Sequence, residues 1–270
     1  MTSILDEILT RKKKDVEAAK KLRAPDLIKS LAREAKKPCD LYDALMPDQN
    51  GAVTIIAECK KQSPSKGLIS DNYQPTELAS RYEHGGAAAI SVLTDEPYFG
   101  GNRDDLRRVC ERVSIPVIRK DFIIDDYQIW EARALGASSF LLLAGTLDFP
   151  GLQYFIELGR ELGMEPLVES HNQEQLNIAL KTDAKILGIN NRNLNDFSVS
   201  LEQSQSLTQA VLEDSTERIL VCESGIKNLD DIIVMQKSGF QSFLIGETLV
   251  RSDDPESLIR EFSKGSSASH

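Results

Sequence analysis

The sequence is poor in the residues that mark disulfide-bonded, metal-binding and membrane-spanning proteins. Its four cysteines, Cys39, Cys59, Cys110 and Cys222, show no CxxC spacing, so we expect reduced thiols in a cytoplasmic protein. The three histidines are scattered, and no metal site is predicted. No apolar run approaches the roughly 20 residues of a membrane span, and the N-terminus lacks the apolar segment of a signal peptide.

Excess basic charge and cofactor motifs are also missing. The formal net charge of −10 argues against nucleic acid or an anionic membrane as the main partner. A phosphorylated substrate would need local positive charge, some of which Lys60 could supply. No GxGxxG motif follows any predicted strand, and no cofactor is predicted. The chain has 270 residues, a length that fits two domains or a single (β/α)8 barrel of about 250 residues.

What the sequence does contain is a repeated alternation of strand and helix patterns. Short apolar segments recur roughly every 20 to 30 residues, the size of a βα unit. Helical patterns lie between them, for example Pro75–His84 and Asp125–Leu135, and glycines follow these helices where a C′ residue belongs. Eight such units favour an α/β closed parallel barrel, a TIM barrel, over an open doubly wound sheet. The predicted strands are Val53–Cys59, Ala88–Leu93, Pro116–Lys120, Ser139–Leu143, Glu165–Glu169, Ile186–Asn190, Ile219–Cys222 and Ser242–Ile245.

The barrel is expected to carry an N-terminal helical extension. Residues 1–50 have helical apolar spacing and are divided by Pro25 and Pro38, whereas residues 51–264 hold the barrel and residues 265–270 a disordered tail. The basic run Arg11–Lys14 continues into residues of mixed charge. We interpret it as a solvated helix face, with a basic binding patch as the alternative.

Polar residues gather where the predicted strands end. Glu58 and Lys60 share one face of the first strand, and Cys59 points to the other. In a barrel of this kind the carboxyl ends of the strands form the active-site face. Each such residue alone is more often a structural cap, but most of the strands end this way. The others are Thr94 and Asp95, Lys120 and Asp121, Glu169, Asn190 with Arg192 beyond it, and Glu223 with Ser224.

Two late loops are typical of phosphate binding. Glu223-Ser224-Gly225-Ile226 and Leu244-Ile245-Gly246-Glu247-Thr248 follow the seventh and eighth strands. Small residues there let backbone N–H groups approach an anion. Plain tight turns are the alternative interpretation.

These motifs together resemble the indole-3-glycerol phosphate synthase family, a (β/α)8 barrel of tryptophan biosynthesis, across essentially the whole chain. The chain is too short for the second barrel that some members carry. The matching stretches are Ile4-Leu5-Asp6-Glu7-Ile8, Ala57-Glu58-Cys59-Lys60, Ser63-Pro64-Ser65-Lys66-Gly67, Val92-Leu93-Thr94-Asp95 with Tyr98-Phe99, Arg119-Lys120-Asp121-Phe122-Ile123, Glu165-Pro166-Leu167-Val168-Glu169, Gly188-Ile189-Asn190-Asn191-Arg192 and the two phosphate loops.

The resemblance implies a lyase that converts 1-(2-carboxyphenylamino)-1-deoxyribulose 5-phosphate into indole-3-glycerol phosphate, carbon dioxide and water. Ring closure needs a cationic acid at the ketone oxygen, which matches Lys120; dehydration needs a base, which matches Glu169. Lys60 could share the acid role. The other implied roles are a carboxylate that keeps a lysine charged (Glu58), groups that complete the catalytic set (Asn190, Ser224), substrate contacts (Ser63, Phe99, Phe122, Arg192, Glu223) and phosphate contacts (Lys60, Ser63, Gly225, Gly246, Glu247).

Other interpretations remain at this stage. A Schiff-base lysine is disfavoured because Glu58 beside Lys60 favours the ammonium form. Phe99 and Phe122 could be ordinary core residues, and His171 has no evident partner, so we expect a loop or capping role for it. Another sugar-phosphate isomerase or aldolase, or a non-catalytic barrel, would fit the fold. We expect a monomer with a small anionic substrate and neither nucleic acid nor membrane as partner.

Overall fold

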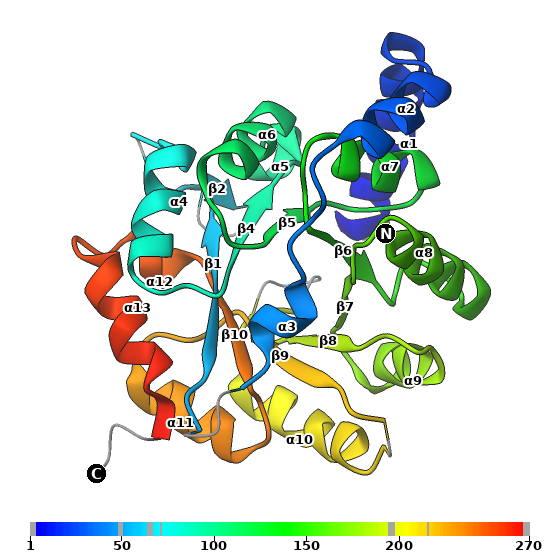
Figure 1. Ribbon diagram of the computed structural model, residues 1–270. Helices are drawn as coiled ribbons and strands as arrows, with labels where there is room; N and C mark the ends of the chain where they lie inside the picture. The colour runs from blue at the N-terminus through cyan, green and yellow to red at the C-terminus, as the bar shows by residue number, and fades with distance from the viewer. Residues whose placement is uncertain are drawn as a thin grey trace.

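The computed structural model describes residues 4–47, 51–63, 67–70, 72–193, 198–214 and 216–266. Within these residues eight parallel strands close into a barrel in the order β1-β10-β9-β8-β7-β6-β5-β4 (Figure 1). The predicted (β/α)8 fold is confirmed, and the bounds of the strands differ from the prediction by at most two residues. The strands are β1 Thr54–Cys59, β4 Ala89–Leu93, β5 Val117–Lys120, β6 Ser139–Leu143, β7 Leu167–Ser170, β8 Ile186–Asn190, β9 Ile219–Glu223 and β10 Ser242–Ile245.

Helices surround the barrel, and local sequence sets their ends. Asp125, Asn172 and Asn228 each accept a backbone N–H at the start of a helix, as N-cap residues do. Gly86 and Gly136 take positive φ angles of 90° and 92° directly after two of the helices, where a side chain would be strained. The helices are α4 Pro75–His84, α5 Glu96–Phe99, α6 Arg103–Arg112, α7 Asp126–Ala134, α8 Phe149–Glu161, α9 Gln173–Lys181, α10 Leu201–Leu212, α11 Leu229–Lys237, α12 Glu247–Val250 and α13 Pro255–Ser263.

The alternation of strand side chains divides the core into two layers. Inward residues such as Ile56, Ile118 and Leu167 fill the barrel, and outward residues such as Ile55 and Cys59 pack under the helices. The short helix α3, Leu41–Leu45, adds its two leucines to the inner layer and lies in front of the barrel in Figure 1. The amino-terminal end is thereby closed by apolar side chains, and the opposite end is left for polar groups.

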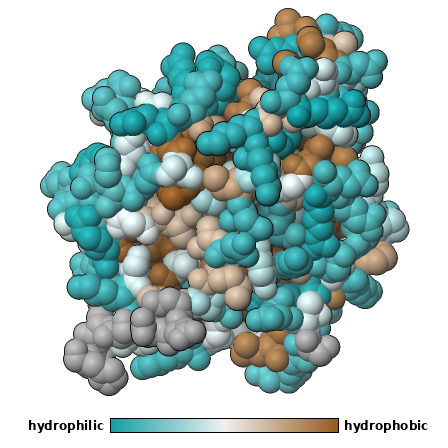
Figure 2. All heavy atoms as spheres, viewed as in Figure 1, coloured by the Kyte–Doolittle hydropathy of each residue, from teal (hydrophilic) through white to brown (hydrophobic). Residues whose placement is uncertain are grey.

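The N-terminal helices α1, Ile4–Leu22, and α2, Pro25–Glu34, lie beside α7 (Figure 1). Ala19 and Ile28 pack against Tyr127, whose hydroxyl also donates to the Ala19 carbonyl at 3.2 Å. The face of the molecule in Figure 2 is mostly hydrophilic, with hydrophobic side chains exposed near α2. Among the described helices, none combines the length and apolar character needed to cross a membrane.

The loop after β1 contains a small hairpin that the sequence did not predict. Strands β2, Gln62–Ser63, and β3, Gly67–Leu68, pair antiparallel over the site face. Residues 64–66 of the predicted loop motif lie outside the described residues. At the other end of the chain, Ser266 of the expected tail donates its backbone N–H to Gln236, and residues 267–270 lie outside the description.

Candidate active site

Four strands end with an ionisable side chain two residues beyond an apolar residue of the inner layer. Because side chains two apart share a face of a strand, these four groups point into the same mouth of the barrel. In each of these strands, the inward-facing position that follows the last apolar residue of the inner layer is occupied by a charged or ionisable side chain. These side chains form the polar end of the barrel. Glu58 follows Ile56, Lys120 follows Ile118, Glu169 follows Leu167, and Glu223 follows Val221.

Lys120 is the centre of this group. Its Nζ lies 3.1 Å from Glu223 Oε2, 3.2 Å from Glu169 Oε2 and 4.0 Å from Glu58 Oε2. Lys60 Nζ lies 2.5 Å from the other oxygen of Glu58. The structure thus brings together both lysines and the carboxylates that the sequence singled out. We call these five residues the inner cluster.

The inner cluster opens into a cavity of about 800 Å³ at the carboxyl ends of the strands. Phe99 and Phe122 form part of its wall, with ring centroids 6.2 Å apart, and both rings are half-buried. Glu223 is an exception, because it is fully buried and contacts Lys120 without lining the cavity. The residues predicted for the site that do line it are Glu58, Lys60, Ser63, Phe99, Lys120, Phe122, Glu169, Asn190, Arg192, Ser224, Gly225, Gly246 and Glu247.

The crowding of charge pushes the pKa values of the inner cluster apart. Burial opposes the positive charge of Lys120, but the carboxylates Glu169 and Glu223 outweigh burial and raise the pKa of the ammonium. Burial also opposes ionisation of Glu169, yet Lys120 and His171 hold its pKa well below the usual range. For Glu223, burial and the neighbouring charge of Glu169 raise the pKa well above the usual range, with Lys120 only partly offsetting them.

This arrangement can carry out acid–base chemistry. Lys120 is a buried cation that can protonate or polarise an oxygen, and Glu169 is an ionised carboxylate beside it. The pKa of Glu223 is shifted in the opposite direction, toward the protonated form. Neighbouring groups whose pKa values are driven in opposite directions are typical of active sites. A Schiff-base role for Lys120 is disfavoured, because a raised pKa keeps the amine protonated.

The end of β8 and the loop after it provide side chains that contact Glu169 and the backbone near Ser224. Asn190 Nδ2 donates to Glu169 Oε1 at 3.1 Å, and Asn190 Oδ1 accepts the backbone N–H of Arg192. Asn191, which the sequence analysis did not assign, donates its side-chain amide to the carbonyls of Glu223 and Ser224. Ser224 has a φ of 63°, and no other non-glycine residue among those described has a positive φ. Asn191 therefore ties down a strained backbone at the cavity.

Two glycines make room for carboxylates. A Cβ atom on Gly188 would lie 2.1 Å from Glu223 Oε1, and one on Gly246 would lie 2.6 Å from Glu58 Oε1. Either methyl group would displace a buried carboxyl group. The sequence predicts Gly246 only as part of a phosphate-binding loop. The structure shows that it also leaves room for the carboxyl group of Glu58.

His171 does not lack a partner, as the sequence analysis supposed. It lies in the loop after β7, but its Nε2 is 2.8 Å from Glu169 Oε1 and its Nδ1 is 3.0 Å from the Arg192 carbonyl oxygen. Glu169 is thus contacted by Lys120 on one oxygen and by Asn190 and His171 on the other. The expected loop position is right, and the absence of a partner is wrong.

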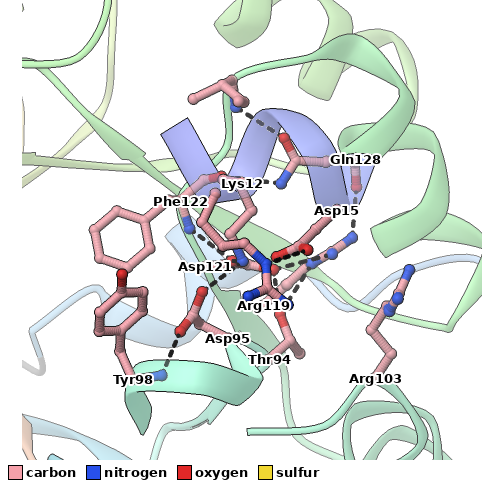
Figure 3. Close-up of polar contacts among 12 residues, drawn as sticks. Lys12, Asp15, Thr94, Asp95, Tyr98, Arg103, Arg119, Asp121, Phe122 and Gln128 are labelled. Carbon is pink, nitrogen blue, oxygen red and sulfur yellow. Dashed lines mark hydrogen bonds and ion pairs between the residues drawn. The ribbon is translucent and has the colours of Figure 1, made fainter. Parts of the chain in front are cut away.

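A second buried cluster of charges lies on the outer side of β5, and Figure 3 shows it. Lys12 of α1 reaches Asp95 Oδ2 at 2.7 Å and Asp121 Oδ1 at 2.6 Å. Arg119 contacts Asp121 at 3.1 Å and Glu131 at 2.9 Å. We call these five residues the outer cluster. The prediction that Arg11–Lys14 is a solvated face is therefore wrong for Lys12, which is only 5% exposed.

The described residues contain no group of three or more His, Cys, Asp or Glu side chains placed to hold a metal ion.

The chain is similar to known proteins of one family. Residues 5–262 match the family model described as indole-3-glycerol phosphate synthase. The indole-3-glycerol phosphate synthase of Neisseria meningitidis serogroup B is 45% identical over 260 residues, covering 96% of this chain and 98% of the relative. That of Chlorobium chlorochromatii is 44% identical over 255 residues, covering 94% and 98%.

A solved structure, thiamine phosphate pyrophosphorylase from Pyrococcus furiosus, superposes with a TM-score of 0.58. It shares 15% sequence identity and covers 82% of this chain and 98% of its own, so it supports the barrel fold alone. From the family model and the relatives together, the chain belongs to the indole-3-glycerol phosphate synthase family.

Proposed function

We propose that this chain catalyses ring closure, decarboxylation and dehydration of 1-(2-carboxyphenylamino)-1-deoxyribulose 5-phosphate, giving indole-3-glycerol phosphate, carbon dioxide and water in tryptophan biosynthesis. The observation that carries the proposal is the position of Lys120 among Glu58, Glu169 and Glu223 at the floor of the cavity. Family membership supplies the reaction, and this arrangement supplies groups of the kinds that the reaction needs.

Ring closure is assigned to Lys120 as the acid. The aromatic carbon that bears the carboxylate attacks the ketone carbon, and the ketone oxygen takes a proton from the ammonium to become a hydroxyl. The bond to the carboxylate then breaks, carbon dioxide leaves, and the electron pair restores the aromatic ring. Because its pKa is raised, Lys120 is positively charged when substrate arrives and can polarise the ketone oxygen and stabilise the negative charge that develops on it.

Dehydration is assigned to Glu169 as the base. It removes a proton from carbon, while a lysine ammonium protonates the departing hydroxyl so that water leaves. Lys60 and Lys120 are both within the inner cluster and remain candidates for this second acid step. Glu58 contacts Lys60 closely and Lys120 at longer range, which supports its role of holding the lysines charged.

Substrate contacts are assigned by position along the cavity. Phe99 and Phe122 are placed against the anthranilate ring, and Arg192 lies near the mouth. Asn190 and Ser224 are assigned to orient the substrate through hydrogen bonds. We move Glu223 from direct substrate contact to an action through Lys120, because it is buried behind that residue. The phosphate is assigned to Lys60, Ser63, Gly225, Gly246 and Glu247.

One chain contributes all of these groups, which supports a monomer as the catalytic unit; analytical ultracentrifugation would measure it. The four free cysteines support a cytoplasmic location.

The decisive experiment incubates the purified protein with the anthranilate–ribulose phosphate and follows the appearance of indole fluorescence. Absence of product under conditions where the protein is folded would refute the proposed reaction. A variant refines the roles: Glu169→Gln should lower kcat by about a hundredfold with little change in KM, as expected for a base in the chemical step. A rise in KM alone would make Glu169 a binding residue.

A further inference from the structure

His171 has a position that neither the resemblance nor the proposed roles explain. Only 10% of its side chain is exposed, and it contacts the carboxylate that we assign as the base. The backbone N–H of His171 donates to Gln175 Oε1 at 2.8 Å, so the first turn of α9 fixes the loop. Contacts to both the backbone and the ring of His171 therefore fix the position of the imidazole.

Both ring nitrogens lie close to an oxygen atom: Nδ1 makes a hydrogen-bond contact with a backbone carbonyl, and Nε2 lies at ion-pair distance from a carboxylate without hydrogen-bond alignment. The Arg192 carbonyl, 3.0 Å from Nδ1, can only accept a hydrogen bond, so Nδ1 must carry a proton. Glu169 Oε1, 2.8 Å from Nε2, belongs to a carboxylate that Lys120 keeps ionised, and it can also only accept. A neutral imidazole has one N–H and would point a lone pair at one of these oxygens. The geometry thus fits the doubly protonated imidazolium.

The positions of the charges around Glu169 point the same way. Lys120 contacts only Oε2 of this carboxylate, and this lysine is shared with Glu58 and Glu223. An imidazolium at His171 adds a positive charge on the side of Glu169 that Lys120 does not reach. It thus acts together with Lys120 to keep Glu169 ionised.

We propose that His171, as an imidazolium, is a positioning residue that holds the Glu169 carboxylate in its orientation and in its ionised form for catalysis. The proposal rests on the function proposed above, because it gives Glu169 the role of base. His171 lies beside the base and need not contact substrate.

The proposal has a defined pH dependence. The charged groups that act on His171 among the described residues are Glu169, which contacts its ring, and Lys120 behind that carboxylate; Arg192 contacts the ring through its backbone carbonyl. Burial and Lys120 lower the pKa of His171, but Glu169 outweighs them and raises it above 6.5. As the pH rises through that raised pKa, the imidazolium is lost and turnover should decline. A variant without the imidazole should lack this decline.

The first test is kinetic and uses His171→Asn in the full chain, with His84→Asn as the matched control on the exposed end of α4. We expect His171→Asn to lower kcat about tenfold with KM changed less than about twofold, and to lose the alkaline decline. His84→Asn should behave as wild type. Unchanged kcat and an unchanged pH profile in a folded His171→Asn variant would overturn the proposal.

The second test does not depend on turnover. The chain has three histidines, so imidazole NMR signals can be assigned with the single variants of His84 and His270 even if His171→Asn does not fold. We expect the His171 signal to titrate above pH 6.5 in the wild type and at a lower pH in Glu169→Gln. A midpoint at or below 6.5, or one unaffected by Glu169→Gln, would refute the pairing. If substrate is not turned over at all, the proposed function fails while this titration still decides the pairing.

Discussion

Arg119 and Lys120 are neighbours on β5, and they belong to the outer and the inner cluster respectively. Alternation along the strand sends Arg119 toward the helices and Lys120 into the barrel. Both side chains are buried, and each contacts more than one carboxylate. One strand therefore carries two buried ion networks, one on each face, and they differ in the directions in which the pKa values of their groups are shifted.

Asp121 is the hydrogen-bonding centre of the outer cluster. Besides its pairs with Lys12 and Arg119, Asp121 accepts from the Thr94 hydroxyl at 2.7 Å and from the Phe122 backbone N–H at 2.8 Å. Burial opposes its charge, but Lys12 and Arg119 prevail and lower the pKa of Asp121 to about 2. With Arg103 on Glu131, the network has as many cationic as anionic groups. Such a network connects α1 to the ends of β4 and β5.

The inner cluster has more carboxyl groups than lysines, and its pKa values are split. Glu169 is driven toward the ionised form, whereas the neighbouring Glu223 is driven toward the protonated form. The comparison teaches that burial alone does not mark a catalytic charge. Lys12, Arg119 and Asp121 of the outer cluster are all driven toward their charged forms, whereas Glu223 of the inner cluster is driven toward its neutral form beside an ionised carboxylate. This split in pKa distinguishes a site that can move a proton from a network that only stabilises.

The largest effect is expected in the outer cluster. Lys12→Met would leave Asp95 and Asp121 without their shared cation, and removing one partner of a buried ion pair costs about 3–5 kcal/mol. Urea unfolding would measure this loss, with the exposed Lys13→Met as the control that should change little. Equal stability of the two variants would show that the outer cluster does not stabilise the packing of α1 against the barrel.

The inner cluster should respond mainly in activity. Lys120→Met removes the proposed acid and should lower kcat by about a hundredfold or more. Indole fluorescence under saturating substrate would measure it, and Lys60→Met provides the comparison between the two candidate acids. Near-normal turnover in both variants would show that neither lysine is the acid. It would also contradict the catalytic role of the inner cluster.

Features set by residues close together in the sequence could be predicted, and features set by contacts between distant residues could not. Strand alternation is local, and it correctly placed Glu58 and Lys60 on one face and Cys59 on the other. The barrel then followed from the repeated βα units. Lys12 could not be found in this way, because its two aspartates follow distant strands and its own neighbours in sequence, Arg11 and Lys13, are exposed basic residues.

Two further features of the site depend on tertiary contacts. The contact of His171 with Glu169 requires the loop after β7 to fold back over the strand end, although the spacing of two residues was a signal that both side chains could share a side. The burial of Glu223 depends on Gly188 of the neighbouring strand β8, which leaves room for its carboxyl group. Neither follows from the periodicity of a single element.

A smaller effect is expected in the pH dependence of stability, through Asp121 of the outer cluster. The folded pKa of Asp121, about 2, lies below the roughly 3.9 of an unfolded aspartate. The stabilisation from Asp121 is therefore complete above pH ~3.9 and is lost as the pH falls toward about 2. Asp121→Asn should flatten the stability curve in that window, measured by urea unfolding at each pH. A curve as steep as that of the wild type would assign the acid sensitivity to other carboxylates.

The smallest effect compares the same substitution at two glutamates of the inner cluster. Glu223 has a raised pKa in the folded state, so its contribution to stability is complete below the unfolded pKa of about 4.3 and is lost as the pH rises toward the folded pKa. Glu223→Gln keeps the neutral form and should therefore gain on the order of 1 kcal/mol relative to the wild type at neutral pH. Glu169 has a lowered pKa, so Glu169→Gln discards a charge that Lys120 and His171 stabilise, and it should lose stability. Urea unfolding at pH 7.5 would compare the two variants, and changes of the same sign would mean that the proton is not held by Glu223.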